Sequence, residues 1–182
     1  MPATKLSIVE NVQLPGLDVH MPRLGFGTFQ MQGQECIDAC LAALEVGYRH
    51  IDTAQMYTNE AEVGKALAQS KLDRSEVFVT TKIVSAALKA DRTYKRVFKS
   101  AEMIGGKDGY VDLFLVHSPS GGPDARKAKW EAIEKLYQEG KTRAIGVSNY
   151  QIQHLEELKA YAKVGPQAAP FCVSCIHGTN ER

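Results

Sequence analysis

The stretch VDLFLVH at residues 111–117 is a nearly continuous apolar run that ends in a histidine, a pattern typical of a parallel strand buried on both faces. Three further apolar stretches run into reactive polar side chains: HIDTAQMY at 50–57, FVTTK at 78–82 and RAIGVSN at 143–149. The reactive residues Asp52, Lys82, His117 and Ser148 are separated by 30, 35 and 31 residues, the length of one strand-plus-helix unit. Because parallel strands all end at the same edge, the sequence predicts that these residues meet at one rim.

Composition and charge restrict the class of protein. The chain has 182 residues, 44% apolar and 24% charged, as expected for a single globular domain over residues 1–182. The net charge of +1 argues against nucleic acid or an anionic membrane as the main partner. The first 30 residues contain charges and prolines where a signal peptide or spanning helix needs an apolar core. We therefore expect a cytoplasmic protein.

Strands and helices are predicted to alternate from residue 24 onward. The expected strands cover residues 24–28, 48–53, 77–82, 111–117 and 142–148. The expected helices cover residues 34–46, 91–104, 126–139 and 151–162, with one more after a capping box formed by Asn59 and Glu62. Ahead of these units, Pro15-Gly16 within residues 12–19 predicts a β-hairpin that covers one end of the sheet.

Five such units fit either a doubly wound sheet or part of a (β/α)8 barrel. A dinucleotide-binding doubly wound fold carries G-x-G-x-x-G after its first strand, but residues 25–30 read GFGTFQ and lack the third glycine. Chemistry shared among several strand ends is instead typical of the barrel. The predicted fold class is therefore α/β, an incomplete (β/α)8 TIM barrel of about five βα units plus an N-terminal β-hairpin.

Five segments resemble the signatures of the aldo-keto reductases in order and spacing: MPRLGFGTFQM at 21–31, GYRHIDTAQMYTNEAEVGKAL at 47–67, VFVTTKI at 77–83, DLFLVHSP at 112–119 and KTRAIGVSNY at 141–150. The resemblance covers about residues 10–164. It implies NADPH-dependent reduction of a small aldehyde or ketone. It also implies a catalytic group and a set of cofactor contacts, with no metal. These are Asp52, Tyr57, Lys82 and His117 for catalysis, and Gly27, Thr28, Ser148 and Asn149 for the cofactor.

The residue types suit the implied chemistry. Carbonyl reduction delivers a hydride to carbon and a proton to oxygen, so a general acid must stand near that oxygen. Tyr57 is the expected acid, and a close Lys82 ammonium would lower the pKa of its phenol. Asp52 would pair with Lys82 and keep it charged. His117 would orient the substrate carbonyl or share in proton transfer.

Each of these residues also has a structural interpretation. Tyr57 in a loop fits a surface aromatic, and a single strand-end lysine or aspartate fits a solvated charge. Ser148-Asn149 also fits the N-cap of the helix that starts at residue 151. Their occurrence together at the ends of consecutive buried strands favours a site. Candidates for apolar lining at the rim are Phe29, Met56 and Trp130, the last of which also fits a helix core.

The cysteines have two interpretations as well. Cys36 and Cys40 lie four residues apart on an apolar helix face and fit packed thiols. Cys172 and Cys175 have C-x-x-C spacing with His177 nearby, which fits a redox or metal motif. Neither the strand-then-helix context of the redox motif nor a set of four zinc ligands is evident, so reduced thiols are the simpler interpretation.

The final segment, residues 165–182, departs from the family pattern. A full barrel needs about 250 residues, and QAAPFCVSCIHGTNER at 167–182 lacks the family's glutamine strand, stacking aromatic and basic segment for the 2′-phosphate. Residues 171–176 alone fit a sixth strand on apolar content. One hypothesis is an alternatively spliced or frame-shifted end. The alternative function is then a catalytically inactive truncated isoform that acts through protein interaction, with self-association at exposed barrel edges.

Overall fold

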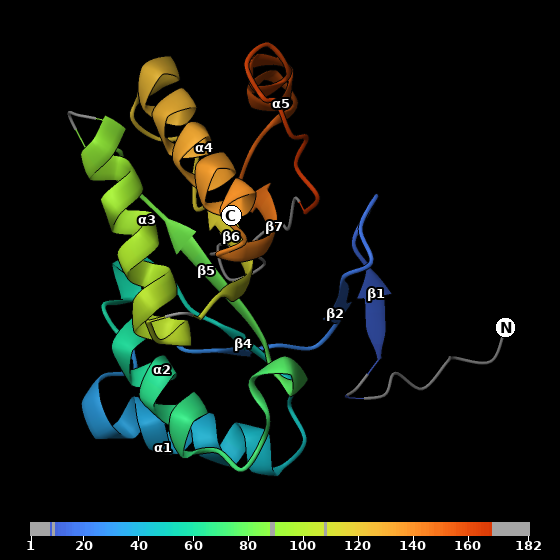
Figure 1. Cartoon of the computed structure of the whole chain (residues 1–182), viewed down its shortest axis with the longest axis vertical. Helices are drawn as coiled ribbons and strands as arrows, with labels where there is room; N and C mark the ends of the chain where they lie inside the picture. The colour runs from blue at the N-terminus through green and yellow to red at the C-terminus, as the bar shows by residue number, and fades with distance from the viewer. Residues whose placement is uncertain (1–7, 9, 88–89, 108, 169–182) are drawn as a thin grey trace, which may run out of the picture.

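The parallel sheet is assembled in chain order. In the computed structural model, which describes residues 8, 10–87, 90–107 and 109–168, the strands pair in the order β3-β4-β5-β6-β7, and every pair is parallel (Figure 1). Helices connect successive strands, as parallel pairing requires. The strand order of a doubly wound sheet reverses at a switch point, and this one does not. The prediction of a partial (β/α)8 barrel is therefore confirmed.

The elements match the predicted alternation closely. The strands are β3 (Phe26–Gly27), β4 (His50–Asp52), β5 (Phe78–Ile83), β6 (Val111–Val116) and β7 (Thr142–Val147). The helices are α1 (Gly33–Glu45), α2 (Glu60–Gln69), α3 (Ala90–Gly105), α4 (Gly122–Gln138) and α5 (Ile152–Lys159), with short 3-10 turns η1 (Gln55–Tyr57) and η2 (Arg74–Glu76). Helix α4 begins earlier than predicted because Pro123 lies in its first turn, where a missing N–H leaves no bond unmade.

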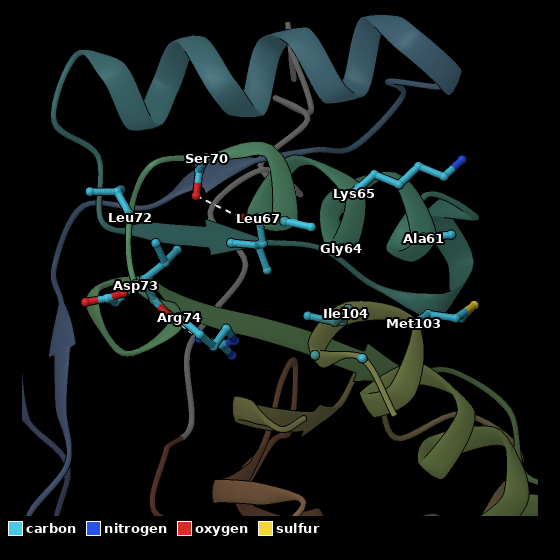
Figure 2. A pocket seen from close by; sticks show the side chains of 14 residues that line it. Ala61, Gly64, Lys65, Leu67, Ser70, Leu72, Asp73, Arg74, Met103 and Ile104 are labelled. Carbon is cyan, nitrogen blue, oxygen red and sulfur yellow. Dashed lines mark hydrogen bonds between the residues drawn. The ribbon is translucent and has the colours of Figure 1, made fainter. Parts of the chain in front are cut away.

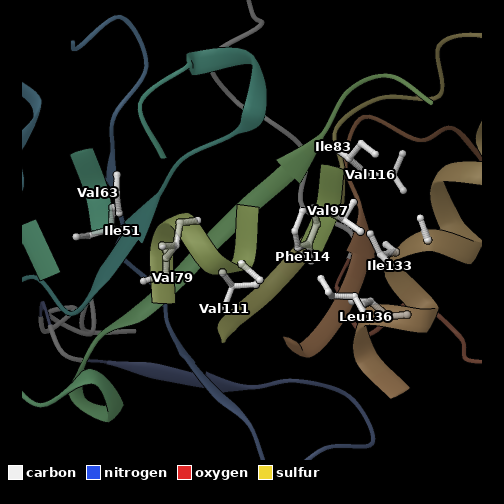
Figure 3. Close-up of a cluster of buried hydrophobic side chains, with 14 of the residues drawn as sticks. Ile51, Val63, Val79, Ile83, Val97, Val111, Phe114, Val116, Ile133 and Leu136 are labelled. Atoms are coloured by element: carbon white, nitrogen blue, oxygen red, sulfur yellow. The ribbon is translucent and has the colours of Figure 1, made fainter. Parts of the chain in front are cut away.

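The main core lies between the sheet and the helices (Figure 3). Phe114 and Val116 of β6 pack there against fully buried side chains of α4, among them Ile133 and Leu136. The alternate residues of β6, such as Leu113, belong to a second cluster on the opposite face of the sheet. Strand β6 is thus buried on both faces, as its continuous apolar run predicts.

The predicted hairpin is present and covers the second cluster. Strands β1 (Asn11–Gln13) and β2 (His20–Pro22) pair antiparallel, and Figure 1 shows them on the side of the sheet away from the helices. The turn between them closes with a hydrogen bond of 2.8 Å from Leu14 N–H to the Val19 carbonyl. Both of these side chains are buried against the inward-facing residues of β6 and β7.

Two local predictions are wrong. Asn59 precedes α2, yet its side chain caps no backbone group of that helix. The N-cap of α5 is Gln151 rather than Ser148 or Asn149. In both cases the asparagine amide bonds a neighbouring loop instead, as described below. The predicted strand at 171–176 lies outside the described residues. No helix of the described part of the chain is long and apolar enough to cross a membrane.

Candidate active site

Lys82 and Asp52 form the centre of the rim. Lys82 on β5 is 5% exposed, and its Nζ donates to Asp52 Oδ1 at 2.5 Å and to the Thr53 carbonyl at 2.9 Å. Asp52 ends β4, the strand hydrogen-bonded to β5, so the order of the sheet brings the two side chains together. A buried ammonium is tolerated only when its charge and its N–H donors are matched in this way.

Tyr57 lies directly beside this pair. It ends the 3-10 turn η1 that follows β4, and Lys82 Nζ lies 3.4 Å from the Tyr57 hydroxyl oxygen. The ammonium also lies 5.0 Å from the centre of the Tyr57 ring. The side chain is half-buried against the ring of Phe29, with centroids 5.1 Å apart. The phenol is therefore held at the rim by packing, with its hydroxyl directed to the cation.

His117 completes the group. Its ring meets that of Tyr57 edge-to-face, with centroids 5.9 Å apart. Burial, together with the nearby Lys82 cation, lowers the pKa of His117 to about 4, so the imidazole is neutral at pH 7. Its Nδ1 is buried and has no hydrogen-bond partner within the described ranges. A neutral imidazole carries one N–H donor and one acceptor nitrogen, which suits it to bind a carbonyl oxygen.

The four predicted cofactor contacts lie on the same rim. Gly27 is exposed and pairs with Asp52 in the β3-β4 register. Thr28 N–H donates to the Asp52 carbonyl at 3.0 Å, and the Thr28 side chain is buried. Asn149 has a left-handed backbone (φ 60°), and its Nδ2 donates to the His117 carbonyl at 2.9 Å and to Ser148 Oγ at 3.1 Å. The structure therefore brings all eight predicted residues into one connected arrangement.

Two supporting residues do not follow from the sequence patterns. The Asn59 amide donates to the Thr28 carbonyl at 2.8 Å and to the Met31 carbonyl at 2.9 Å, and its oxygen accepts from the Thr53 hydroxyl at 2.7 Å. Gln32 Nε2 donates to the Tyr57 carbonyl at 2.7 Å. These contacts tie the loop after β3 to the loop after β4. The sequence carries no signal for these contacts, because the position of Asn59 fits a helix cap equally well.

The apolar candidates separate into two groups. Phe29 and Met56 are 56% and 54% exposed and flank Tyr57 in space or sequence, so they remain candidates for lining the rim. Trp130 is fully buried in the main core and does not line the rim. The helix-core interpretation of Trp130 is therefore correct.

A separate cavity lies at the other end of the strands. Figure 2 shows it between α2, the loop that follows α2 and the end of α3, with a volume of about 490 Å³. Leu67, Val77 and Ile104 are among its lining residues, and none of the eight candidate residues lines it. Val77 precedes β5, whereas Lys82 lies near the end of that strand. This cavity is therefore not part of the rim.

Metal-ligating side chains do not gather in the described part of the chain, where no three His, Cys, Asp or Glu residues form a metal-binding group. Cys36 and Cys40 are free, fully buried thiols in the main core. Burial raises the pKa of Cys40 to about 12, so this thiol is unreactive at neutral pH. Cys172, Cys175 and His177 lie outside the described residues.

The fold and the rim together define a class of protein: a (β/α)8-type chain with a tyrosine hydroxyl, a buried ammonium and a neutral imidazole at the carboxyl ends of its strands. The family follows from comparison. The chain belongs to the aldo/keto reductase family, whose model matches residues 23–173.

Individual relatives show how much of the family's length is present. The chain is 44% identical over 149 residues to 9,11-endoperoxide prostaglandin H2 reductase of Trypanosoma cruzi, covering 81% of this chain and 51% of that protein. It is 43% identical over 149 residues to glyoxal reductase of Bacillus subtilis, covering 81% and 52%. An aldo-keto reductase of Bombyx mori, solved in complex with NADP, superposes with a TM-score of 0.75 at 28% identity over 90% of this chain and 58% of that one. The chain thus spans about half the length of these curated relatives.

Proposed function

We propose that the protein reduces an aldehyde or ketone to the alcohol with NADPH, and that Tyr57 is the general acid. The observation that carries this proposal is the contact between Lys82 and both Asp52 and the Tyr57 hydroxyl, at 2.5 and 3.4 Å. The relative from Bacillus subtilis acts on glyoxal by its name, a small dicarbonyl, which agrees with a carbonyl substrate.

The reaction needs two transfers to the carbonyl group. The cofactor supplies a hydride to the carbonyl carbon when it is bound. The Tyr57 hydroxyl gives its proton to the carbonyl oxygen, and the Lys82 ammonium stabilises the negative charge left on the phenol oxygen. Asp52 keeps Lys82 charged and in place. The neutral His117 ring donates a hydrogen bond to the carbonyl oxygen and so orients it.

The residues at the end of β7 fit a nicotinamide carboxamide. Asn149 Nδ2 is occupied by the His117 carbonyl and Ser148 Oγ. Its amide oxygen receives no hydrogen bond from the described residues, so it is available to accept one from the carboxamide. Gly27 is exposed beside Asp52 and leaves room for the cofactor. The choice of NADPH is supported by the relative from Bombyx mori, which was solved with NADP.

Turnover of the purified chain tests the proposal. NADPH oxidation is followed spectrophotometrically with a generic aldehyde, for the wild type and for Tyr57→Phe, which removes only the hydroxyl. We expect a loss of about 10²- to 10⁴-fold, the usual contribution of a positioned general acid. Tyr48→Phe, at a tyrosine before β4 that packs against Phe26, is the matched control and should keep wild-type activity. A chain that does not turn over, or an active Tyr57→Phe, contradicts the proposal.

We also propose that the chain self-associates through its sheet edges. Strand β3 lies at one end of the described sheet and has only two residues. Strand β7 at the other end is partly covered, because Val147 N–H donates to the Ala168 carbonyl at 3.0 Å and Gln167 N–H donates to the Ile145 carbonyl at 2.9 Å. Open edges with unpaired backbone groups favour pairing with another chain. This arrangement would suit a chain that acts through protein interaction rather than turnover. Light scattering after size-exclusion chromatography gives the mass: a dimer or larger supports the proposal, and a monomer at high micromolar concentration contradicts it.

A further inference from the structure

Lys129 is a fully buried lysine that the proposed reaction does not use. It lies on α4, is 0% exposed, and its Nζ donates to three backbone carbonyls. These belong to Val84, just after β5, at 3.2 Å, to Ser118 at 3.0 Å and to Ser120 at 2.9 Å. All three N–H donors of the ammonium are therefore used, and all three acceptors lie in the loops that follow β5 and β6.

Arg126, one turn earlier on α4, binds the carbonyl of Pro119, which lies between Ser118 and Ser120 in the same loop. Its Nη1 donates to the Pro119 carbonyl at 3.0 Å, and its other nitrogens bind the Glu157 carboxylate of α5. The carbonyls of residues 118, 119 and 120 thus all accept from cations of α4. We call Arg126, Lys129 and residues 118–120 the α4 clamp. The clamped loop begins at the residue after His117.

The cost of this arrangement indicates a specific purpose. Burial lowers the pKa of Lys129 to about 8, so the side chain stays mostly protonated at pH 7. Burying an ammonium carries a desolvation cost, which here only hydrogen bonds to neutral carbonyls offset. What the lysine adds is a rigid link between α4 and two strand-end loops. The backbone of His117 is also bonded to residues outside the α4 clamp. Its backbone N–H donates to the Ile83 carbonyl at 2.9 Å, and its carbonyl accepts from Asn149 Nδ2.

We infer that Lys129, through the α4 clamp, is a positioning residue that fixes the His117 ring against Tyr57. The inference rests on the proposed function only for its catalytic consequence, because the placement of the ring exists without turnover. Lys129 also acts on the ring as a charge, since its cation is one of the causes of the lowered pKa of His117. Loss of Lys129 therefore has two expected effects on His117: a less fixed ring and a higher pKa.

The test is NMR of the histidine ring signals in the full chain, labelled with carbon-13 in the imidazole rings. The His117 signal is the one that disappears in His117→Asn. In Lys129→Met we expect the His117 signal to shift and broaden, and its titration midpoint to rise. The His50 signal should stay in place, because His50 is buried at the far end of the sheet against Pro22 and Thr80. Lys127→Met is the matched control, at a neighbouring lysine of α4 that is 52% exposed, and should change neither signal.

The outcomes are separable. An unchanged His117 signal and midpoint in folded Lys129→Met overturns the inference. If that variant does not fold, as judged by loss of the His50 signal, Lys129→Gln replaces it, since its shorter neutral amide keeps two donors but removes the charge. An unchanged midpoint in Lys129→Gln also overturns the inference. With an active chain we expect kcat to fall about 10- to 100-fold with KM for NADPH unchanged. An inactive wild type refutes the proposed function and leaves the NMR result to decide the role of Lys129.

Discussion

Substitution of Asp52 by asparagine should destabilise the fold by an amount that the structure sets. Lys82 would keep its charge and lose the carboxylate at 2.5 Å. Breaking a fully buried ion pair costs about 3–5 kcal/mol, whereas an exposed pair contributes about 0.2–1 kcal/mol. The Lys82 side chain is 6% exposed and that of Asp52 33%, which places this pair between the two limits. We therefore expect Asp52→Asn to lower the free energy of unfolding by about 2 kcal/mol.

Urea unfolding at pH 7 measures this loss, with the fluorescence of the single tryptophan, Trp130, as the signal, since its side chain is fully buried. A double-mutant cycle adds two further variants to Asp52→Asn: Lys82→Met and the double variant. In the double variant no buried charge is left unpaired. The double variant should lose less stability than the sum of the two single losses, by about 1 kcal/mol or more. The exposed pair of Lys127 and Glu131, both 52% exposed, gives the control cycle and should show coupling below about 0.5 kcal/mol. Equal coupling in the two cycles would refute this reasoning.

Two further predictions concern the core and the rim. Phe114→Ala removes a fully buried ring and should lower the free energy of unfolding in urea by about 3–5 kcal/mol. Phe29→Ala, at a ring 56% exposed, should lower it by under about 1 kcal/mol. A larger loss for Phe29→Ala than for Phe114→Ala would contradict the assignment of the core. For His117, the folded-state pKa of about 4 lies below the ordinary value of 6.5, so the unfolded chain binds more protons between these values and stability decreases as the pH is lowered from 6.5 to 4. His117→Asn should therefore lose less stability than the wild type between pH 6.5 and 4 in thermal denaturation, while identical losses would contradict the buried, neutral state of this ring.

The larger features of the fold follow from periodic patterns in the sequence. Regular spacing of apolar runs gives the parallel order of β3 to β7, and that order alone brings Asp52, Lys82 and His117 to one edge. The hairpin follows from its Pro-Gly turn, and its place follows from the buried Leu14 and Val19. These predictions succeed because a parallel strand buried on both faces needs a nearly continuous apolar run, which is visible in a single sequence.

The supporting contacts of the rim do not follow in the same way. Asn59 fits a helix cap by its position, and only the path of the loop after β3 shows that its amide reaches two carbonyls there. Lys129 lies on the apolar stripe of α4 with Ile133 and Leu136, which is a visible signal. A lysine at such a position usually extends its stem along the core and keeps its ammonium in water, so the pattern alone does not predict a buried charge. The acceptors of that charge are loop carbonyls, which carry no sequence signature.

Transfer of deuterium from labelled NADPH tests most directly whether the strand-end residues form one carbonyl-reducing site. The purified chain is incubated with NADPH deuterated at the transferred position and an aldehyde, and the alcohol is analysed by mass spectrometry. The proposed site predicts one deuterium on the carbinol carbon with the wild type, and about 10²- to 10⁴-fold less product with Tyr57→Phe at equal cofactor binding. Unlabelled alcohol, or no alcohol from a wild-type chain that binds NADPH, would contradict it.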